Sequence, residues 1–131
     1  MRQMLQVMKA RLLAGEDLVM VTVTASSGAT PRGAGARMLV GKSGRICGTI
    51  GGGAVEYRSE QIALTVLQEK SSRGHDFTLT RDDVQNLGMI CGGACNVFFH
   101  YLSAGDPDIL ALADEAEARF VAHRIRALLD A

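Results

Sequence analysis

The sequence predicts an α/β (mixed α+β) fold in a single compact domain, with a mixed β-sheet flanked by helices and a long C-terminal helix. Three observations lead to this prediction. The chain has 131 residues, a usual length for one domain, and 47% of them are hydrophobic, which is enough for an apolar core. Short β-branched runs alternate along the chain with segments of helical periodicity. Glycine-rich stretches separate several of these segments.

The first half of the chain is expected to hold one helix and three strands. Residues 1–14 carry apolar side chains at three- and four-residue spacings, which predicts a helix. Residues 18–25 (LVMVTVTA) are rich in β-branched residues and read as a buried strand. Residues 36–41 and 45–50 are predicted to be two further strands, and the short turn at 42–44 between them indicates a hairpin.

The second half is expected to alternate between helix and strand before a helical tail. Residues 54–70 fit a helix, and residues 75–80 and 95–102 fit strands. Asp106 is a good N-cap and Pro107 a good first helical residue, so a long helix is predicted to follow. We therefore expect a motif-bearing core over about 15–102 and a helical tail over 103–131 within one domain of residues 1–131.

Charge and cysteine content exclude several classes of function. Lys and Arg number 14, as do Asp and Glu, so the balanced chain offers no strong field for nucleic acid or an anionic membrane. The odd number of cysteines, 3, fits a reduced compartment, and no signal peptide or membrane span is evident. We expect a cytoplasmic protein. Near-zero net charge and an apolar-faced terminal helix favour a homo-oligomer, expected to be a homodimer.

A first glycine-rich loop over 26–37 has the composition of an oxyanion site. Its glycines let backbone N–H groups approach a ligand, and its hydroxyls and arginines are donors for phosphate or carboxylate. The alternative is a connection that merely needs flexible residues, but arginines within a glycine loop favour binding. The candidate residues are Ser27, Gly28, Thr30, Pro31, Arg32, Gly33 and Arg37.

A second glycine-rich loop, over 48–56, stands between a predicted strand and a predicted helix. Gly51, Gly52 and Gly53 would place backbone amides at the positive end of that helix, where an anion is stabilised. The loop lacks the Gly-Lys-Ser/Thr of a P-loop and the spacing of a Rossmann fingerprint. Glu56 has two open roles. It either caps the helix end, or it accepts hydrogen bonds from a ligand ring or positions an arginine.

A third stretch, 87–95 (LGMICGGAC), places a thiol beside glycines. Cys91 directly precedes Gly92 and Gly93, a setting that can favour the thiolate, which is a soft metal ligand or a nucleophile for sulfur transfer. Cys47 and Cys95 fall in predicted strands and are expected to be small buried apolar residues. The cysteine and histidine spacings match no zinc site, and no serine triad is visible.

At these loops the sequence resembles a known family. The segments SSGATPRGAGARMLV, GTIGGGAVE and LGMICGG, in this order and spacing, are similar to the signatures of the XdhC/CoxI family over roughly residues 15–102. Members of that family are accessory proteins of molybdenum hydroxylases such as xanthine dehydrogenase and carbon monoxide dehydrogenase. Many also carry a C-terminal Rossmann-like domain, and we expect this chain to be a version of the N-terminal domain without it.

The resemblance implies a chaperone that holds the molybdenum cofactor, a molybdopterin, as cargo for insertion into its target enzyme. It implies that the loop residues bind the cofactor and that Cys91 is a candidate molybdenum ligand. Implied partners are a molybdenum hydroxylase apo-enzyme, a cysteine desulfurase and a separate Rossmann-domain protein. Two rival hypotheses stay open: a thiol-dependent sulfur-transfer enzyme with Cys91 as the catalytic residue, and an interaction module without a small-molecule ligand.

Overall fold

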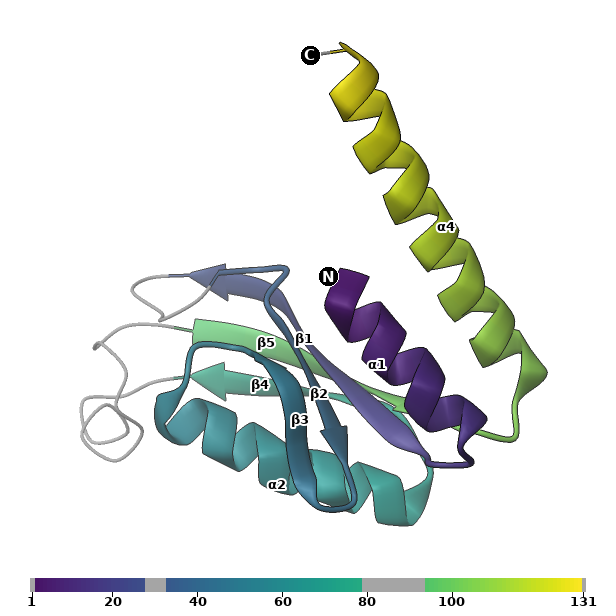
Figure 1. Ribbon diagram of the computed structural model, residues 1–131. Helices are drawn as coiled ribbons and strands as arrows, with labels where there is room; N and C mark the ends of the chain where they lie inside the picture. Colours follow the sequence, from purple (N-terminus) through teal and green to yellow (C-terminus); the bar gives the residue numbers. More distant parts are fainter. Residues whose placement is uncertain (1, 28–32, 79–93, 131) are drawn as a thin grey trace.

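The computed structural model describes residues 2–27, 33–78 and 94–130, and it confirms the predicted mixed α+β fold (Figure 1). Every predicted helix and strand is present. Where the sequence predicted the first and last residue of an element, the observed bounds differ by no more than two residues. In chain order the elements are α1 (Arg2–Leu13), β1 (Leu18–Ser27), β2 (Arg37–Gly41), β3 (Gly44–Thr49), α2 (Gly53–Glu69), β4 (Arg73–Thr78), β5 (Ala94–Leu102) and α4 (Pro107–Asp130).

The strands form one sheet in the order β3-β2-β1-β5-β4. Each described pair is antiparallel, so the sheet does not mix parallel and antiparallel pairs as the sequence suggested. The reason lies in the connection through α2. It joins β3 to β4, which run in the same direction, but these strands lie at opposite edges of the sheet. Strands of like direction are therefore never neighbours here.

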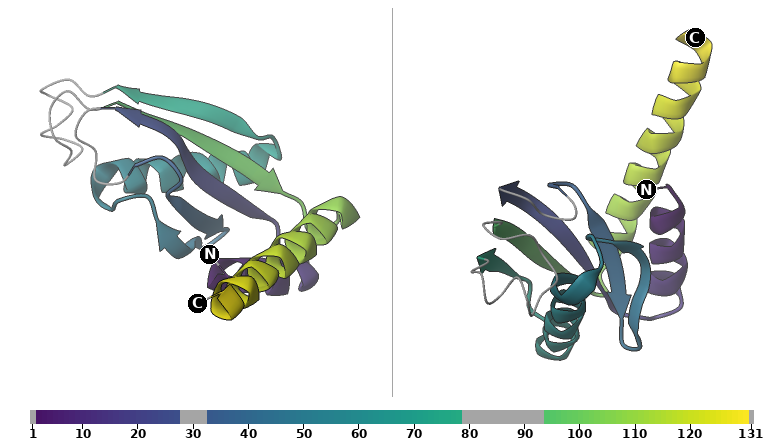
Figure 2. Two further views of the ribbon diagram at one scale, coloured as in Figure 1. Left: turned by 90° about the horizontal axis from the view of Figure 1, so that it is seen from above. Right: turned by 90° about the vertical axis from the view of Figure 1, so that its left-hand side faces the viewer.

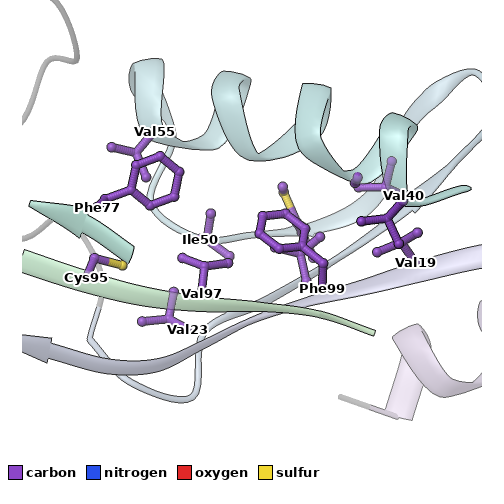
Figure 3. Packing of buried hydrophobic residues seen from close by; sticks show 13 residues of the cluster. Val19, Val23, Val40, Ile50, Val55, Phe77, Cys95, Val97 and Phe99 are labelled. Atoms are coloured by element: carbon purple, nitrogen blue, oxygen red, sulfur yellow. The ribbon is translucent and has the colours of Figure 1, made fainter. Parts of the chain in front are cut away.

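Helices cover both faces of the sheet (Figure 2). The buried side chains form two apolar clusters. The alternation along β5 illustrates the division, since Cys95, Val97 and Phe99 are buried in the α2-side cluster while Phe98 and His100 are exposed. Figure 3 shows the side chains of that larger cluster packed between α2 and the sheet. The smaller cluster joins α1 and the start of α4 to the opposite face through Leu5, Met8, Leu12, Leu18, Leu39, Leu102 and Ala113.

The tail helix α4 begins as the sequence predicted. Asp106 Oδ1 accepts a hydrogen bond from the backbone N–H of Asp108 at 2.9 Å, the usual contact of an N-cap side chain. The first turns of α4 pack on α1, supported by an ion pair between Lys9 and Asp114. Beyond them the helix extends away from the sheet (Figures 1 and 2). Within the described parts of the chain, no helix is both long and apolar enough to cross a membrane.

One end of the sheet gathers the described residues that flank the predicted motifs. Ser27 pairs with Ala94, and Ala94 pairs with Thr78, so the ends of β1 and β4 and the start of β5 form one row. The start of α2 lies over the same end, because Val55 packs in one cluster with Phe77 (Figure 3). The glycine loop before α2 is therefore held at this end of the sheet.

A β-bulge bends β1 just before it reaches that end. The register with β5 shifts between Val23 and Ala25, leaving Thr24 as the extra residue. The Thr24 hydroxyl donates a hydrogen bond to the carbonyl oxygen of Asn96 at 3.2 Å. Bulges are common beside functional sites, where they redirect the chain. The bulge lies three residues before the end of β1, where the first glycine-rich segment continues the chain.

Candidate ligand-binding site at the start of α2

The loop between β3 and α2 has a backbone that only glycine adopts readily. Gly51, Gly52 and Gly53 have φ values of 125°, 75° and 67°. Gly52, the N-cap residue of α2, combines its positive φ with ψ −167°, a region that is essentially restricted to glycine. The first-turn amides of Gly53 and Ala54 have no acceptor within the helix. The loop thus presents backbone donors at the positive end of α2.

Glu56 folds back from the first turn of α2 and holds this loop. Its Oε1 accepts hydrogen bonds from Thr49 Oγ1 at 2.5 Å, from the amide of Ile50 at 2.9 Å and from the amide of Gly52 at 3.2 Å. Thr49 Oγ1 in turn accepts a hydrogen bond from the amide of Gly51 at 3.0 Å. The carboxylate therefore neutralises the helix end from within the chain, and two loop amides are already bound to it.

The surroundings of Glu56 keep it ionised. Burial raises the pKa of the carboxyl group, but the hydrogen bonds from Thr49, Ile50 and Gly52 and the charge of Arg45 lower it, and the resulting pKa lies below the ordinary glutamate value. At neutral pH the group is an anion. An anionic ligand approaching the loop would meet this negative charge as well as the amides.

Arg45 of β3 contacts both ends of the loop. Its Nη1 donates a hydrogen bond to the carbonyl oxygen of Gly48 at 2.8 Å, and its Nε lies 3.9 Å from Glu56 Oε2. The arginine side chain is 45% exposed, so the ion pair contributes only about 0–1 kcal/mol to stability. Its backbone N–H donates to Glu60 Oε1 at 3.1 Å, which fixes the start of the side chain.

The structure places some of the predicted site residues beside this loop. Arg37, at the start of β2, pairs with Thr49, the last residue of β3. Gly33 lies near the end of β1, since a Cβ on it would stand 3.9 Å from Ser26 Oγ, and Ser27 is the last residue of that strand. Gly51, Gly52, Gly53 and Glu56 form the loop itself. Outside the described residues lie Gly28, Thr30, Pro31, Arg32, Cys91, Gly92 and Gly93.

Two contacts of the site were not predicted from the sequence. Thr49 lies in the predicted loop over 48–56, seven positions before Glu56, but its hydroxyl was given no role, and a search for a hydroxyl facing the carboxylate could have found that role. Arg45 looked like an ordinary residue after a hairpin turn. Its contact with Glu56 arises only when β3 and the start of α2 are brought together, and no local pattern encodes that.

The two described thiols lie in strands, Cys95 buried and Cys47 partly buried. Burial raises the pKa of Cys95 in β5, and burial likewise raises the pKa of Cys47 in β3 despite the nearby charges of Arg11 and Arg45. Among the described residues no group of three His, Cys, Asp or Glu side chains is placed to hold a metal ion. Cys91, the predicted molybdenum ligand, lies outside those residues.

Together these features define a small α+β domain in which a glycine-rich loop opens a helix and an internal carboxylate holds it in place. The profile of the XdhC and CoxI family matches residues 12–82, more than half of the chain. The chain belongs to this family.

Two Escherichia coli (strain K12) proteins and one solved structure are similar to this chain. It is 31% identical over 111 residues to the molybdenum cofactor insertion chaperone PaoD, covering 82% of this chain and 33% of PaoD. It is 42% identical over 79 residues to the uncharacterized protein YqeB, covering 60% of this chain and 14% of YqeB. A Bacillus halodurans crystal structure described as a xanthine dehydrogenase matches with a TM-score of 0.72 and 25% identity, covering 92% of this chain and 35% of that one. The chain thus spans about a third or less of each relative.

Proposed function

We propose that this protein binds the molybdenum cofactor as cargo and acts as a chaperone in the maturation of a xanthine dehydrogenase or carbon monoxide dehydrogenase type enzyme. The observation that carries the proposal is the similarity to the insertion chaperone PaoD over 82% of the chain. Membership of the XdhC and CoxI family supports it. In this role the protein holds and delivers its cargo, and the chemistry belongs to the recipient enzyme.

The geometry at the start of α2 suits such a cargo. The molybdenum cofactor carries the phosphate of its molybdopterin and an oxo-molybdenum head, and both are oxyanion-like groups. The first-turn amides of Gly53 and Ala54 are oriented donors at a helix N-terminus. Arg45 lies on β3, which leads into the loop, and Arg37 of β2 pairs with Thr49 at the end of β3. Arg32 and Cys91 remain in the proposal as a further oxyanion donor and as the molybdenum ligand.

The proposed partners follow from the same role. They are a molybdenum hydroxylase apo-enzyme as recipient, a cysteine desulfurase as the source of sulfur for the cofactor, and a separate Rossmann-domain protein. We also propose that the chaperone works as a homodimer in the cytoplasm. Light scattering at tens of micromolar, a concentration of about the order at which weak association is detected, tests the dimer, and a monomer there would contradict it.

Cofactor capture tests the function. The protein is mixed anaerobically with released molybdenum cofactor and passed over a sizing column, and molybdenum and oxidised-pterin fluorescence are read in the protein peak. Co-elution of both is expected, with loss on Arg32→Ala or Cys91→Ala. Arg58→Ala, an exposed arginine of α2, is the matched control and should retain the cofactor.

Separate outcomes distinguish the site from the function. Capture by the wild type that is unaffected by Arg32→Ala and Cys91→Ala would leave the carrier role standing and remove these two residues from the site. Absence of pterin and molybdenum from the wild-type peak would count against a carrier role for this chain alone.

A further inference from the structure

We propose that Arg45, held in place by Glu56, is a ligand-binding residue that supplies the charged donor for an oxyanion group of the cargo. This inference rests on the proposed function, because it names the residue that would recognise the anionic part of the cofactor. Arg45 belongs to none of the three glycine-rich motifs, and its place in the site follows from its contacts with the loop.

The first step of the argument is that the inner loop amides are already used. Ile50 and Gly52 donate to Glu56 Oε1 at 2.9 and 3.2 Å, so their N–H groups are bound to an anion of the chain itself. Glu56 is only 15% exposed and brings a negative charge to the start of α2. A ligand oxyanion therefore needs a positive charge close to the loop to offset this carboxylate.

The second step is that Arg45 is placed to provide that charge. It spans the loop from the carbonyl of Gly48 to the carboxylate of Glu56. Among the described residues, the carbonyl oxygen of Gly48 accepts the guanidinium's hydrogen bond, so other N–H donors of the group are left for a ligand. The side chain is 45% exposed and accessible to a ligand from solvent.

The third step concerns orientation. A guanidinium that is hydrogen-bonded to Gly48 and attracted by the charge of Glu56 loses less freedom when it binds an oxyanion than a free surface arginine does. The pair is too exposed to contribute much to folding, so stability gives little reason for this arrangement. Glu56 thus acts as a positioning residue for Arg45. Its Oε1 atom holds the loop amides, while its Oε2 atom faces the arginine.

The protein itself supplies a matched control. Arg73 and Glu69 form a comparable pair at the other end of α2, with Arg73 Nη1 3.8 Å from Glu69 Oε2 and the arginine 44% exposed. Arg73→Met therefore removes the same kind of side chain, with the same exposure and the same kind of partner, away from the glycine loop. Both Met variants are expected to fold, because neither loses a buried group.

The test compares cofactor capture by wild type, Arg45→Met, Arg45→Lys and Arg73→Met. Loss of a charge-assisted hydrogen bond to an oxyanion is expected to weaken capture by Arg45→Met about 10- to 100-fold. Arg45→Lys should recover part of this loss, because it restores the charge without the planar donor set. Arg73→Met should capture the cofactor like the wild type. Equal capture by Arg45→Met and Arg73→Met would overturn the proposal.

A second measurement decides the proposal even if the wild type captures no cofactor, the result that would reject the proposed function. The Nε–Hε signal of Arg45 is followed by NMR during titration with inorganic phosphate and, separately, with molybdate. A saturable shift with either anion supports the proposal, and the two titrations distinguish the phosphate from the oxo-molybdenum end of the cargo. An Arg45 signal that moves no more than that of Arg73 with both anions would refute it.

Glu56→Gln tests the positioning role. The glutamine oxygen can still accept from Thr49, Ile50 and Gly52, so the loop should persist, while the charge facing Arg45 is lost. We expect a displaced Arg45 Nε–Hε signal in the unliganded variant and weaker anion binding. An unchanged signal and unchanged binding would show that Glu56 holds the loop without positioning Arg45.

Discussion

Replacing Gly52 with Ala isolates the cost of the backbone conformation on which the glycine loop depends. Gly52 has φ 75° and ψ −167°, a combination that L-residues rarely adopt. A Cβ built on it meets no heavy atom within 4 Å. Steric clash therefore contributes nothing at this position, and any destabilisation of Gly52→Ala comes from the backbone itself.

The magnitude follows from two opposing effects. Holding a non-glycine residue in this region destabilises the folded state by about 1–3 kcal/mol. Alanine also restricts the unfolded chain more than glycine does, which stabilises the folded state by about 0.4–1 kcal/mol. We expect a net loss of about 1–2 kcal/mol in the free energy of unfolding, which lowers the Tm of a chain of this size by about 3–10 °C. Thermal and urea unfolding followed by circular dichroism measure both quantities.

Two further variants bracket this result. Gly105→Ala is the control, since its Cβ would lie 3.8 Å from Ser103 Oγ in ordinary contact, and its Tm should stay close to that of the wild type. Gly48→Ala should lose more than Gly52→Ala, because φ is 79° and its Cβ would stand 2.5 Å from the backbone oxygen of Arg37 and would also clash with Met4 Cε. If Gly52→Ala were as stable as Gly105→Ala, the reasoning from backbone conformation would be refuted.

Three other predictions concern the core, acid stability and the thiols. Ser59 is fully buried in α2, and its hydroxyl has no partner among the residues that the structure describes, so Ser59→Ala should stabilise the fold by about 1 kcal/mol in urea unfolding. The matched Thr65→Ala should gain less, and a destabilised Ser59→Ala would contradict the burial argument. Hydrogen bonds from the Ala104 amide and the Tyr101 hydroxyl lower the pKa of Asp17 despite its burial. The contribution of ionised Asp17 to the free energy of unfolding is therefore present above the unfolded pKa of about 4, and it is lost as the pH falls through the lower folded pKa. Asp17→Asn should therefore reduce stability at pH 7 and flatten its decline in acid, and an unchanged pH profile would contradict this. Because burial raises the pKa of Cys47 and Cys95, both should react with a thiol reagent more slowly in the folded Cys91→Ser variant than after unfolding, and equal rates would contradict that prediction.

The elements of this fold were predictable because their signals are local. The β-branched run at 18–25, the alternation along 95–102 and the Asp106-Pro107 helix start each depend on neighbouring residues alone. The antiparallel pairing of every described strand was not predictable in this way. It depends on α2 carrying the chain from one edge of the sheet to the other, a choice that the hydrophobic pattern of a single helix does not reveal.

The candidate site was predictable only in part, for the same physical reason. A run of glycines before a helix indicates a loop with positive φ values, and the structure has that loop at Gly51, Gly52 and Gly53. The partners of Glu56 depend on the path of the loop, which turns the amides of Ile50 and Gly52 toward the carboxylate. Arg45 reaches the site across the end of β3, and no spacing in the sequence predicts that contact.

Glu56 lies close to both the loop amides and Arg45, so the two roles that the sequence left open for it are compatible. A carboxylate that binds two loop amides fixes the loop, but it also removes those amides as donors and adds a negative charge where an anion is expected. The chain as a whole has a formal net charge of +0, so no long-range field draws an anionic ligand toward it. On the proposed function, recognition of the anion would come from local charge, and Arg45 lies beside both the loop and Glu56. In that proposal the internal carboxylate makes the loop amides alone insufficient for an anion, so an oriented arginine is needed beside them.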